Sequence, residues 1–205
     1  MTLSFYHYTL SELQRYMAEN DHSVSVAGKL FNWHYKKLKS GPCVDDISKN
    51  AITFIASSIS FDLPEVDSIL ESPDRTVKFL FRFPDGKKVE TVLIPSFERY
   101  KICLSSQVGC AMKCTFCHTG LQGLERHLGT HEIVGQYLAA RKWLTLNRKD
   151  DHRIGTIVFM GQGEPLHNFD AVKKACEIFL SQNGLSLAPH KITISTAGYL
   201  PGLER

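Results

Sequence analysis

Residues 155–196 read GTIVFMGQGEPLHNFDAVKKACEIFLSQNGLSLAPHKITIST, in which two apolar runs flank a segment with helical periodicity. Residues 155–160 and 191–196 are short runs rich in β-branched side chains, which is typical of buried strands. Residues 169–181 repeat apolar side chains at helical spacing and end before Asn183-Gly184, a common C-terminal signal of helices. Strand, helix and strand in this order predict parallel pairing through a right-handed crossover.

The same alternation continues toward the N-terminus. Residues 102–105 form a short predicted strand, and residues 130–146 form a predicted helix. Three strands and two helices therefore follow one another, and we predict an α/β fold for residues 99–205. In parallel sheets and barrels, ligands bind at the carboxyl ends of the strands. The loops with unusual residues in this chain all follow predicted strands.

Three short helices are predicted at the N-terminal end of the chain. Thr9-Leu10-Ser11-Glu12 has the form of a capping box, which begins the first helix. Residues 27–38 form the second, and the third follows the acidic pair Asp45-Asp46, whose charges suit a helix N-terminus. We expect a small helical accessory domain over residues 1–70.

A β-hairpin is predicted between the helical domain and the α/β part. Residues 76–83 and 89–94 are rich in β-branched and aromatic side chains, and Pro84-Asp85-Gly86 between them is a turn signal. We expect residues 71–98 to bridge the two larger parts of the chain.

Composition and charge place the chain among soluble globular proteins. Apolar residues make up 43% of its 205 residues and charged residues 22%, and the formal net charge is +3. That charge permits a nucleic-acid partner without arguing for one. No run approaches the roughly 18–20 apolar residues of a membrane span, and the N-terminus lacks the pattern of a secretory signal. We expect a cytoplasmic protein with no membrane partner.

Three cysteines crowd into the run Cys110-Ala-Met-Lys-Cys114-Thr-Phe-Cys117. In a reducing compartment, such crowding indicates metal binding and not disulfide formation. Three thiolates can bind three irons of a four-iron cluster and leave the fourth iron open to a substrate. A structural zinc site that includes His118, or ordinary buried thiols, are the alternatives. Phe116 favours the cluster, since an aromatic ring there can lie against an adenine.

Several ordered motifs make the chain recognisable as a relative of a known family. The cysteine run and its neighbours resemble the radical S-adenosylmethionine methyltransferases that methylate C2 of an adenine in large-subunit ribosomal RNA and in some tRNAs. The motifs that carry the resemblance are Val89-Glu90-Thr91-Val92, Cys103-Leu-Ser-Ser-Gln-Val-Gly-Cys110, Cys114-Thr-Phe-Cys117-His-Thr-Gly120, Met160-Gly161-Gln162-Gly163-Glu164-Pro165-Leu166 and Thr193-Ile194-Ser195-Thr196-Ala197-Gly198. The resemblance covers essentially the whole chain, and it implies a radical S-adenosylmethionine β/α barrel.

The resemblance also implies two cofactors and the residues that bind them. The three cysteines of the run, Cys110, Cys114 and Cys117, would hold a 4Fe-4S cluster. Gly163 and Glu164 would meet the amino group of S-adenosylmethionine, which suits a carbonyl or carboxylate acceptor. Ser195 would contact the ribose. Taken alone, these last three would be a simple turn and a surface hydroxyl.

Two catalytic residues follow from the same resemblance. Glu90 would accept a proton, and Cys103 would resolve a covalent protein–RNA adduct. Taken alone, Glu90 would be a solvated strand residue and Cys103 a buried core thiol. The implied reaction splits S-adenosylmethionine reductively into a 5′-deoxyadenosyl radical, with an electron from a donor such as flavodoxin or ferredoxin.

The chain ends soon after its third predicted strand, whereas members of the family continue, with a methyl-carrying cysteine near their C-terminus. From the sequence we therefore expect a partial, incomplete barrel and a chain that is an inactive fragment. One alternative is a cluster-binding protein without methyltransferase activity. Another is a zinc-stabilised RNA-binding module, whose phosphate contacts would be Lys36, Lys37, Lys39, Lys87, Lys88, Arg141, Lys142, Arg148 and Lys149.

Overall fold

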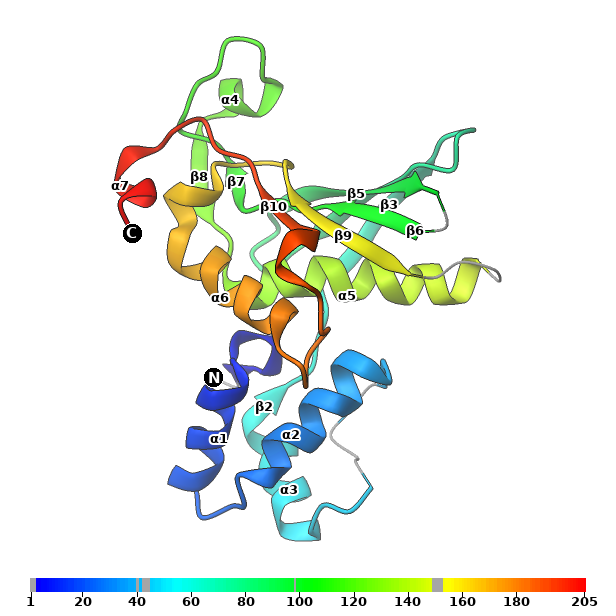
Figure 1. Ribbon diagram of the computed structural model, residues 1–205, viewed down its shortest axis with the longest axis vertical. Coiled ribbons are helices and arrows are strands. Elements are labelled where there is room, and N and C mark those ends of the chain that lie inside the picture. Colours follow the sequence, from blue (N-terminus) through cyan, green and yellow to red (C-terminus); the bar gives the residue numbers. More distant parts are fainter. Residues whose placement is uncertain (1–2, 40, 42–44, 98, 149–152) are drawn as a thin grey trace.

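The computed structural model of the chain describes residues 3–39, 41, 45–97, 99–148 and 153–205. It has the predicted α/β character: one six-stranded sheet, helices packed beside it, and a separate group of short helices formed by the N-terminal residues (Figure 1). Within the described part of the chain, no helix is both long and apolar enough to cross a membrane.

The N-terminal helices are close to those predicted. The Thr9 side chain accepts a hydrogen bond from the Glu12 amide (3.3 Å), and the Glu12 carboxylate accepts one from the Thr9 amide (2.8 Å), so the capping box is formed. The third helix begins after Ser48, whose hydroxyl caps it. The elements are β1 (Leu3–Ser4), the 3-10 turn η1 (Phe5–His7), α1 (Leu10–Glu19), α2 (Ser25–Phe31), the π-helical turn η2 (Asn32–Lys36), α3 (Lys49–Ser58) and β2 (Ile59–Ser60).

The main sheet mixes antiparallel and parallel pairing. Its order is β10-β9-β6-β5-β4-β3, and the strands are β3 (Glu65–Glu71), β4 (Val77–Arg82), β5 (Lys88–Ser96), β6 (Arg99–Cys103), β9 (Ile154–Phe159) and β10 (Ile192–Ile194). Strands β6, β9 and β10 run parallel, as predicted. The predicted hairpin, β4 and β5, continues the same sheet through antiparallel pairing of β5 with β6. Strand β3 was not predicted, because its side chains are mostly exposed and lack an apolar alternation.

The connections carry the remaining elements. Helices α5 (Thr130–Asn147) and α6 (Phe169–Leu180) join the parallel strands, close to the predicted bounds. A two-stranded ribbon of β7 (Gln107–Gly109) and β8 (Leu124–His127) encloses the cysteine loop and was not predicted, because its strands are very short. The other elements are α4 (His118–Gln122), η3 (Pro165–Asn168), η4 (Pro189–Lys191) and α7 (Leu200–Leu203).

The two faces of the sheet differ. Alternate side chains such as Phe79 and Phe81 of β4 are fully buried, and Phe79 meets Trp143 of α5 edge to face. On the opposite face, which we call the open face, the side chains are only half-buried or exposed. The open face consists of Lys78 and Leu80 of β4, Glu90 and Val92 of β5, and Lys101 and Cys103 of β6, as the pairing register and the alternation of burial require.

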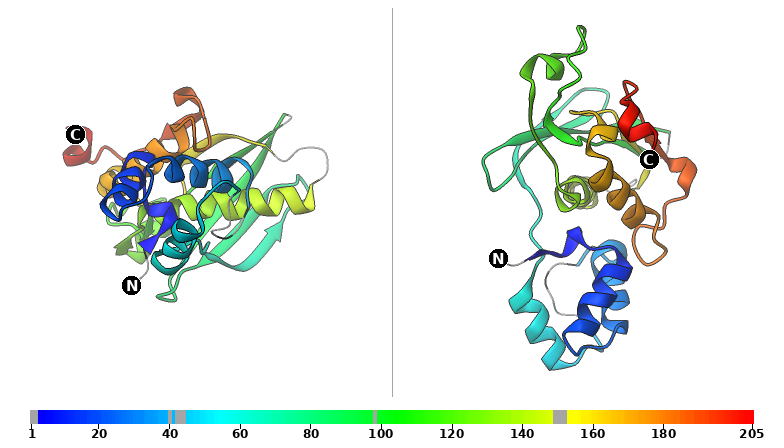
Figure 2. Two further views of the ribbon diagram at one scale, coloured as in Figure 1. Left: turned by 90° about the horizontal axis from the view of Figure 1, so that it is seen from below. Right: turned by 90° about the vertical axis from the view of Figure 1, so that its left-hand side faces the viewer.

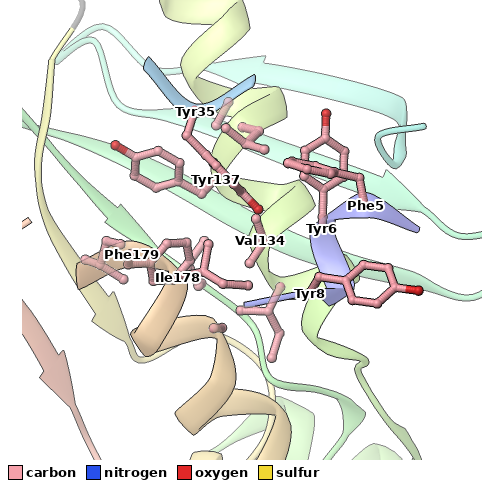
Figure 3. Close-up of a cluster of buried hydrophobic side chains, with 14 of the residues drawn as sticks. Phe5, Tyr6, Tyr8, Tyr35, Val134, Tyr137, Ile178 and Phe179 are labelled. Atoms are coloured by element: carbon pink, nitrogen blue, oxygen red, sulfur yellow. The ribbon is translucent and has the colours of Figure 1, made fainter. Parts of the chain in front are cut away.

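The N-terminal helices pack beneath α5 and α6 (Figure 2, right-hand view). Buried rings of Phe5, Tyr6 and Tyr35 meet the apolar side chains of α5 and α6 in one continuous cluster, which includes Tyr137 and Phe179 (Figure 3). Polar contacts add to it, since Arg141 donates a hydrogen bond to the carbonyl of Tyr35 (2.8 Å) and Lys174 pairs with Glu12 (2.8 Å).

Acid is expected to weaken this helical core through His34. The ring is buried and stacks on Phe61 at 4.3 Å, and burial lowers its pKa to about 4. In the unfolded chain, the His34 ring is protonated below about pH 6.5. Above that pH the ring is neutral in both states, and the free energy of unfolding carries no penalty from its protonation. The free energy of unfolding decreases as the pH falls toward 4, by about 3 kcal/mol in total.

Urea unfolding at pH 7 and at pH 4.5 measures this effect. His34→Phe keeps the stacking and should lose less stability between the two values than the parent chain. His190→Gln, at an exposed position, is the control and should behave like the parent. An equal loss for His34→Phe and the parent would contradict the assignment to His34.

Candidate functional site

A cavity of about 280 Å³ lies where the cysteine loop folds over the carboxyl ends of β9 and β10. Its position, at the end of the molecule away from α1–α3, can be followed in Figure 1 from the place of α4, which begins next to the loop. The predicted cluster and cofactor residues line it together: Cys110, Cys114, Phe116, Cys117, Gly163, Glu164 and Ser195. The two predicted catalytic residues, Glu90 and Cys103, do not line this cavity.

Tight backbone contacts close the neck of the cysteine loop. The Cys110 amide donates a hydrogen bond to the carbonyl of Gly123 (3.0 Å), across the β7–β8 ribbon. Gly109 has a φ of +73°, and a Cβ there would collide with the Gly123 carbonyl, so only glycine fits. Inside the loop, the Cys117 amide donates to the carbonyl of Cys114 (3.0 Å). The loop is therefore a closed turn that brings its three thiols to one cavity.

The thiols of the loop influence one another. Burial raises the pKa of Cys110, and the neighbouring Cys114, Cys117 and Glu164 raise it further, although the Met112 amide donates a hydrogen bond to its sulfur and lowers it. A thiol such as Cys110, whose pKa is raised in the absence of a cation, would become a thiolate on metal binding.

The arrangement of the thiols bears on the kind of metal centre that fits. Among the described residues, no three His, Cys, Asp or Glu side chains converge on the position of a single ion. A zinc site needs such convergence. A four-iron cluster does not, because each thiolate binds a different iron. The three thiols that line the cavity are the donor set that a four-iron cluster uses.

Two glycines bring the loop after β9 against the loop after β6. Gly163 has a φ of +98°, and a Cβ there would lie 2.5 Å from the Cβ of Gln107. A Cβ on Gly161 would lie 2.8 Å from the carbonyl oxygen of Leu104. Both glycines therefore approach the loop after β6 so closely that a side chain has no room.

Glu164 joins the loops that follow two parallel strands. Its side chain is buried, and its carboxylate accepts hydrogen bonds from the amides of Leu166 (2.9 Å) and Ala197 (2.7 Å). Its own amide donates to the side chain of Gln107 (2.8 Å). A carboxylate has about four acceptor positions, so capacity remains at the cavity for a cationic group of a ligand.

Buried side-chain amides hold the site, and sequence reasoning missed them. Gln136 of α5 accepts hydrogen bonds from the Thr91 hydroxyl (2.7 Å) and the Ser105 amide (3.0 Å), and it donates to the Ser105 carbonyl (3.0 Å). Asn168 donates to the carbonyls of Ser106 (2.8 Å) and Leu128 (2.7 Å). A glutamine within a helix that is apolar on most sides was the available signal.

Glu90 and Cys103 share the open face of the sheet. Glu90 pairs with Lys78 at 2.9 Å, and both side chains are 43% exposed. Cys103 lies opposite Val92, the next residue after Glu90 on the same face of β5. Burial raises the pKa of Cys103, and the backbone of Met160, a residue of the cavity wall, acts to lower it. The open face therefore adjoins the cavity.

No family model matches the chain. The dual-specificity RNA methyltransferase RlmN of Bdellovibrio bacteriovorus is 42% identical over 204 residues, which is 99% of this chain and 50% of that protein. The probable RlmN of Aquifex aeolicus is 41% identical over 199 residues, 97% of this chain and 56% of that protein. The chain thus spans about half the length of these curated relatives.

A solved structure agrees with the sequence comparison. A radical SAM methyltransferase from Sphaerobacter thermophilus superposes with a TM-score of 0.88 and 32% sequence identity. The superposition covers 99% of this chain and 59% of that one.

Proposed function

The chain is a homologue of the RlmN-type radical S-adenosylmethionine RNA methyltransferases over about half of their length, and we propose that it acts in C2 methylation of an adenine in RNA. The proposed substrate is 23S ribosomal RNA, with some tRNAs as further substrates. The observation that carries the proposal is one cavity lined by the three thiols and by the loops after β9 and β10. We place the reaction in the cytoplasm, with a flavodoxin or ferredoxin as electron donor.

The cavity residues take the following roles in this proposal. Cys110, Cys114 and Cys117 hold the 4Fe-4S cluster through their thiolates. Glu164, with Gly163 beside it, accepts hydrogen bonds from the ammonium group of S-adenosylmethionine, since an anionic acceptor at the cavity wall suits that cation. The exposed hydroxyl of Ser195 is free to meet the ribose.

Phe116 and the open face complete the proposed site. The Phe116 ring is 92% exposed at the rim of the cavity, so it is available to lie against the adenine. When bound, the cluster supplies an electron to S-adenosylmethionine, and this gives access to a carbon that is not nucleophilic. On the open face, the Glu90 carboxylate accepts the proton that the adenine loses, and Cys103 provides the thiol that releases the product.

The proposed architecture follows the same family. Strands β6, β9 and β10 would be the first strands of a β/α barrel, which their parallel order and the crossover helices α5 and α6 support. Residues 1–70 would be the accessory domain, residues 71–98 the bridge, and residues 99–205 the barrel part. Strand β3, at the end of the first range, nevertheless pairs with β4 in the main sheet.

Metal content tests the proposal first. The full chain is purified without oxygen, supplied with iron and sulfide, and analysed for both. We expect about four of each per chain. With a reductant, the loaded protein should then convert S-adenosylmethionine to 5′-deoxyadenosine. Incubation with RNA then decides whether the chain alone forms C2-methyladenine or is the inactive fragment expected from its sequence. Colourless protein that binds zinc, or no metal at all, would contradict the proposal.

A further inference from the structure

A second, larger cavity lies at the opposite end of the same parallel strands. Its volume is about 560 Å³, twice that of the cysteine cavity, and it opens at the amino ends of β6 and β9. We call it the basic pocket. Three cations from two separate parts of the chain line it together with an aromatic ring and the start of β9: Phe97, Arg99, Lys101, Gly155, Thr156 and Lys191. Among the described residues that line it, none has an acidic side chain.

The three cations have no side-chain partner among the residues that the structure describes. Neither Arg99, Lys101 nor Lys191 makes an ion pair or a side-chain hydrogen bond with any residue in the described ranges. Other cations of the sheet are paired, for example Lys78 with Glu90 (2.9 Å) and Lys88 with Asp67 (2.8 Å). Three unpaired positive charges around one concave surface create a local potential that attracts an anion.

Arg99 lies against the backbone of β9. A Cβ on Gly155 would lie only 2.7 Å from Cδ of Arg99, so the glycine provides the space in which the arginine stem lies. A side chain supported in this way loses less conformational freedom when it binds a ligand than one that extends into solvent. The guanidinium is therefore partly organised before an anion arrives.

Phe97 presents its ring to solvent beside these cations. The Phe97 side chain is completely exposed to solvent. The residue lies in the turn between β5 and β6 and has a φ of +53°. An unpartnered ring on a backbone that disfavours bulky residues is unfavourable in the free protein. A base stacked on the ring would remove that exposed surface, because every nucleic-acid base has a π-face.

We propose that the basic pocket binds RNA, with phosphate groups on Arg99, Lys101 and Lys191 and a base stacked on Phe97. Lys101 and Cys103 are alternate residues on the open face of β6, about 7 Å apart along the strand. RNA held in the pocket is therefore anchored close to Cys103, which is one of the residues proposed to act on the substrate. The inference rests on the proposed function, which makes RNA the substrate. The exposed ring favours RNA over an acidic protein.

Fluorescence anisotropy with a labelled single-stranded RNA of about twenty nucleotides tests the proposal at several salt concentrations. Each of Arg99→Gln, Lys101→Gln and Lys191→Gln should weaken binding and reduce the salt slope by about 0.7. Phe97→Ala should weaken binding about tenfold with an unchanged slope, and Phe97→Trp should restore it with quenching of the indole fluorescence. Lys173→Gln, on the exposed side of α6, removes the same charge elsewhere and should bind like the parent.

Two results would overturn the proposal. The first is an equal loss of affinity in Lys173→Gln and Lys101→Gln, because binding would then follow net charge alone. The second is unchanged binding in Phe97→Ala together with competition by polyglutamate as strong as that by unlabelled RNA, which would indicate an acidic protein partner. Binding is measured without cluster or S-adenosylmethionine. Failure of this inference is therefore distinguishable from failure of the proposed function, which iron content and S-adenosylmethionine cleavage report.

Discussion

Cys117→Ser is expected to abolish assembly of the cluster and to reduce cleavage of S-adenosylmethionine at least about a hundredfold, since even outer-shell changes at metal sites cost up to that much. The thiol lines the cavity with those of Cys110 and Cys114, and three thiolates are needed to hold three irons. A serine hydroxyl is a poor ligand for these irons, so iron and sulfide should be absent from the reconstituted variant.

Cys176→Ser is the matched control for this experiment. Cys176 lies on α6 and does not line the cavity, and burial raises its pKa to about 12. The control should keep its iron and its cleavage activity with only a modest loss of stability. Iron retained at the parent level in Cys117→Ser would show that the cluster is held differently or that the metal is adventitious.

Gln136→Leu is expected to lower the free energy of unfolding by about 3 kcal/mol or more, because it leaves buried donors and acceptors unpaired. The side chain is fully buried and joins three groups, the Thr91 hydroxyl and both backbone groups of Ser105. Leucine has a similar size, so the loss measures the hydrogen bonds and not a cavity. Urea unfolding of the metal-free chain reports it.

The loop that Gln136 holds leads into the cysteine run, so the same variant should bind less iron after reconstitution. Gln182→Leu, at an exposed position, is the control and should change stability by less than about 0.5 kcal/mol. A loss in Gln136→Leu as small as that of the control would mean that the Ser105 backbone finds other partners.

Much of the fold was predictable because its signals are local. Helices α1, α5 and α6 follow from apolar side chains at helical spacing and from the residues that cap or stop each helix. Strand β3 was not predictable, because its exposed, polar side chains obtain their strand geometry by pairing with β4 and not from an alternation of their own. The β7–β8 ribbon also lacks a local sequence signal. The need for glycine at Gly109 becomes evident only in the folded chain, where it lies against the carbonyl of Gly123.

The residues of the candidate site were likewise predictable only where their signal is local. Cys110, Cys114 and Cys117 lie in one short run of the chain. The sequence alone was therefore enough to propose that they bind a metal cluster. Gly163 and Glu164 could be assigned only from the order of motifs along the chain. Glu164 forms hydrogen bonds with Gln107 and Ala197, which belong to loops far away in the sequence. No local sequence pattern predicts such contacts.

The sequence established the parallel strands, their crossover helices, the cysteine loop and the likeness to a family, because each depends on residues that are neighbours along the chain. The tertiary structure established which residues share a surface. Parallel pairing of β6 with β9 and of β9 with β10 is made by hydrogen bonds between distant segments. That pairing brings the three thiols to the loops of the cavity, and it places Lys191 and Lys101 around the same basic pocket.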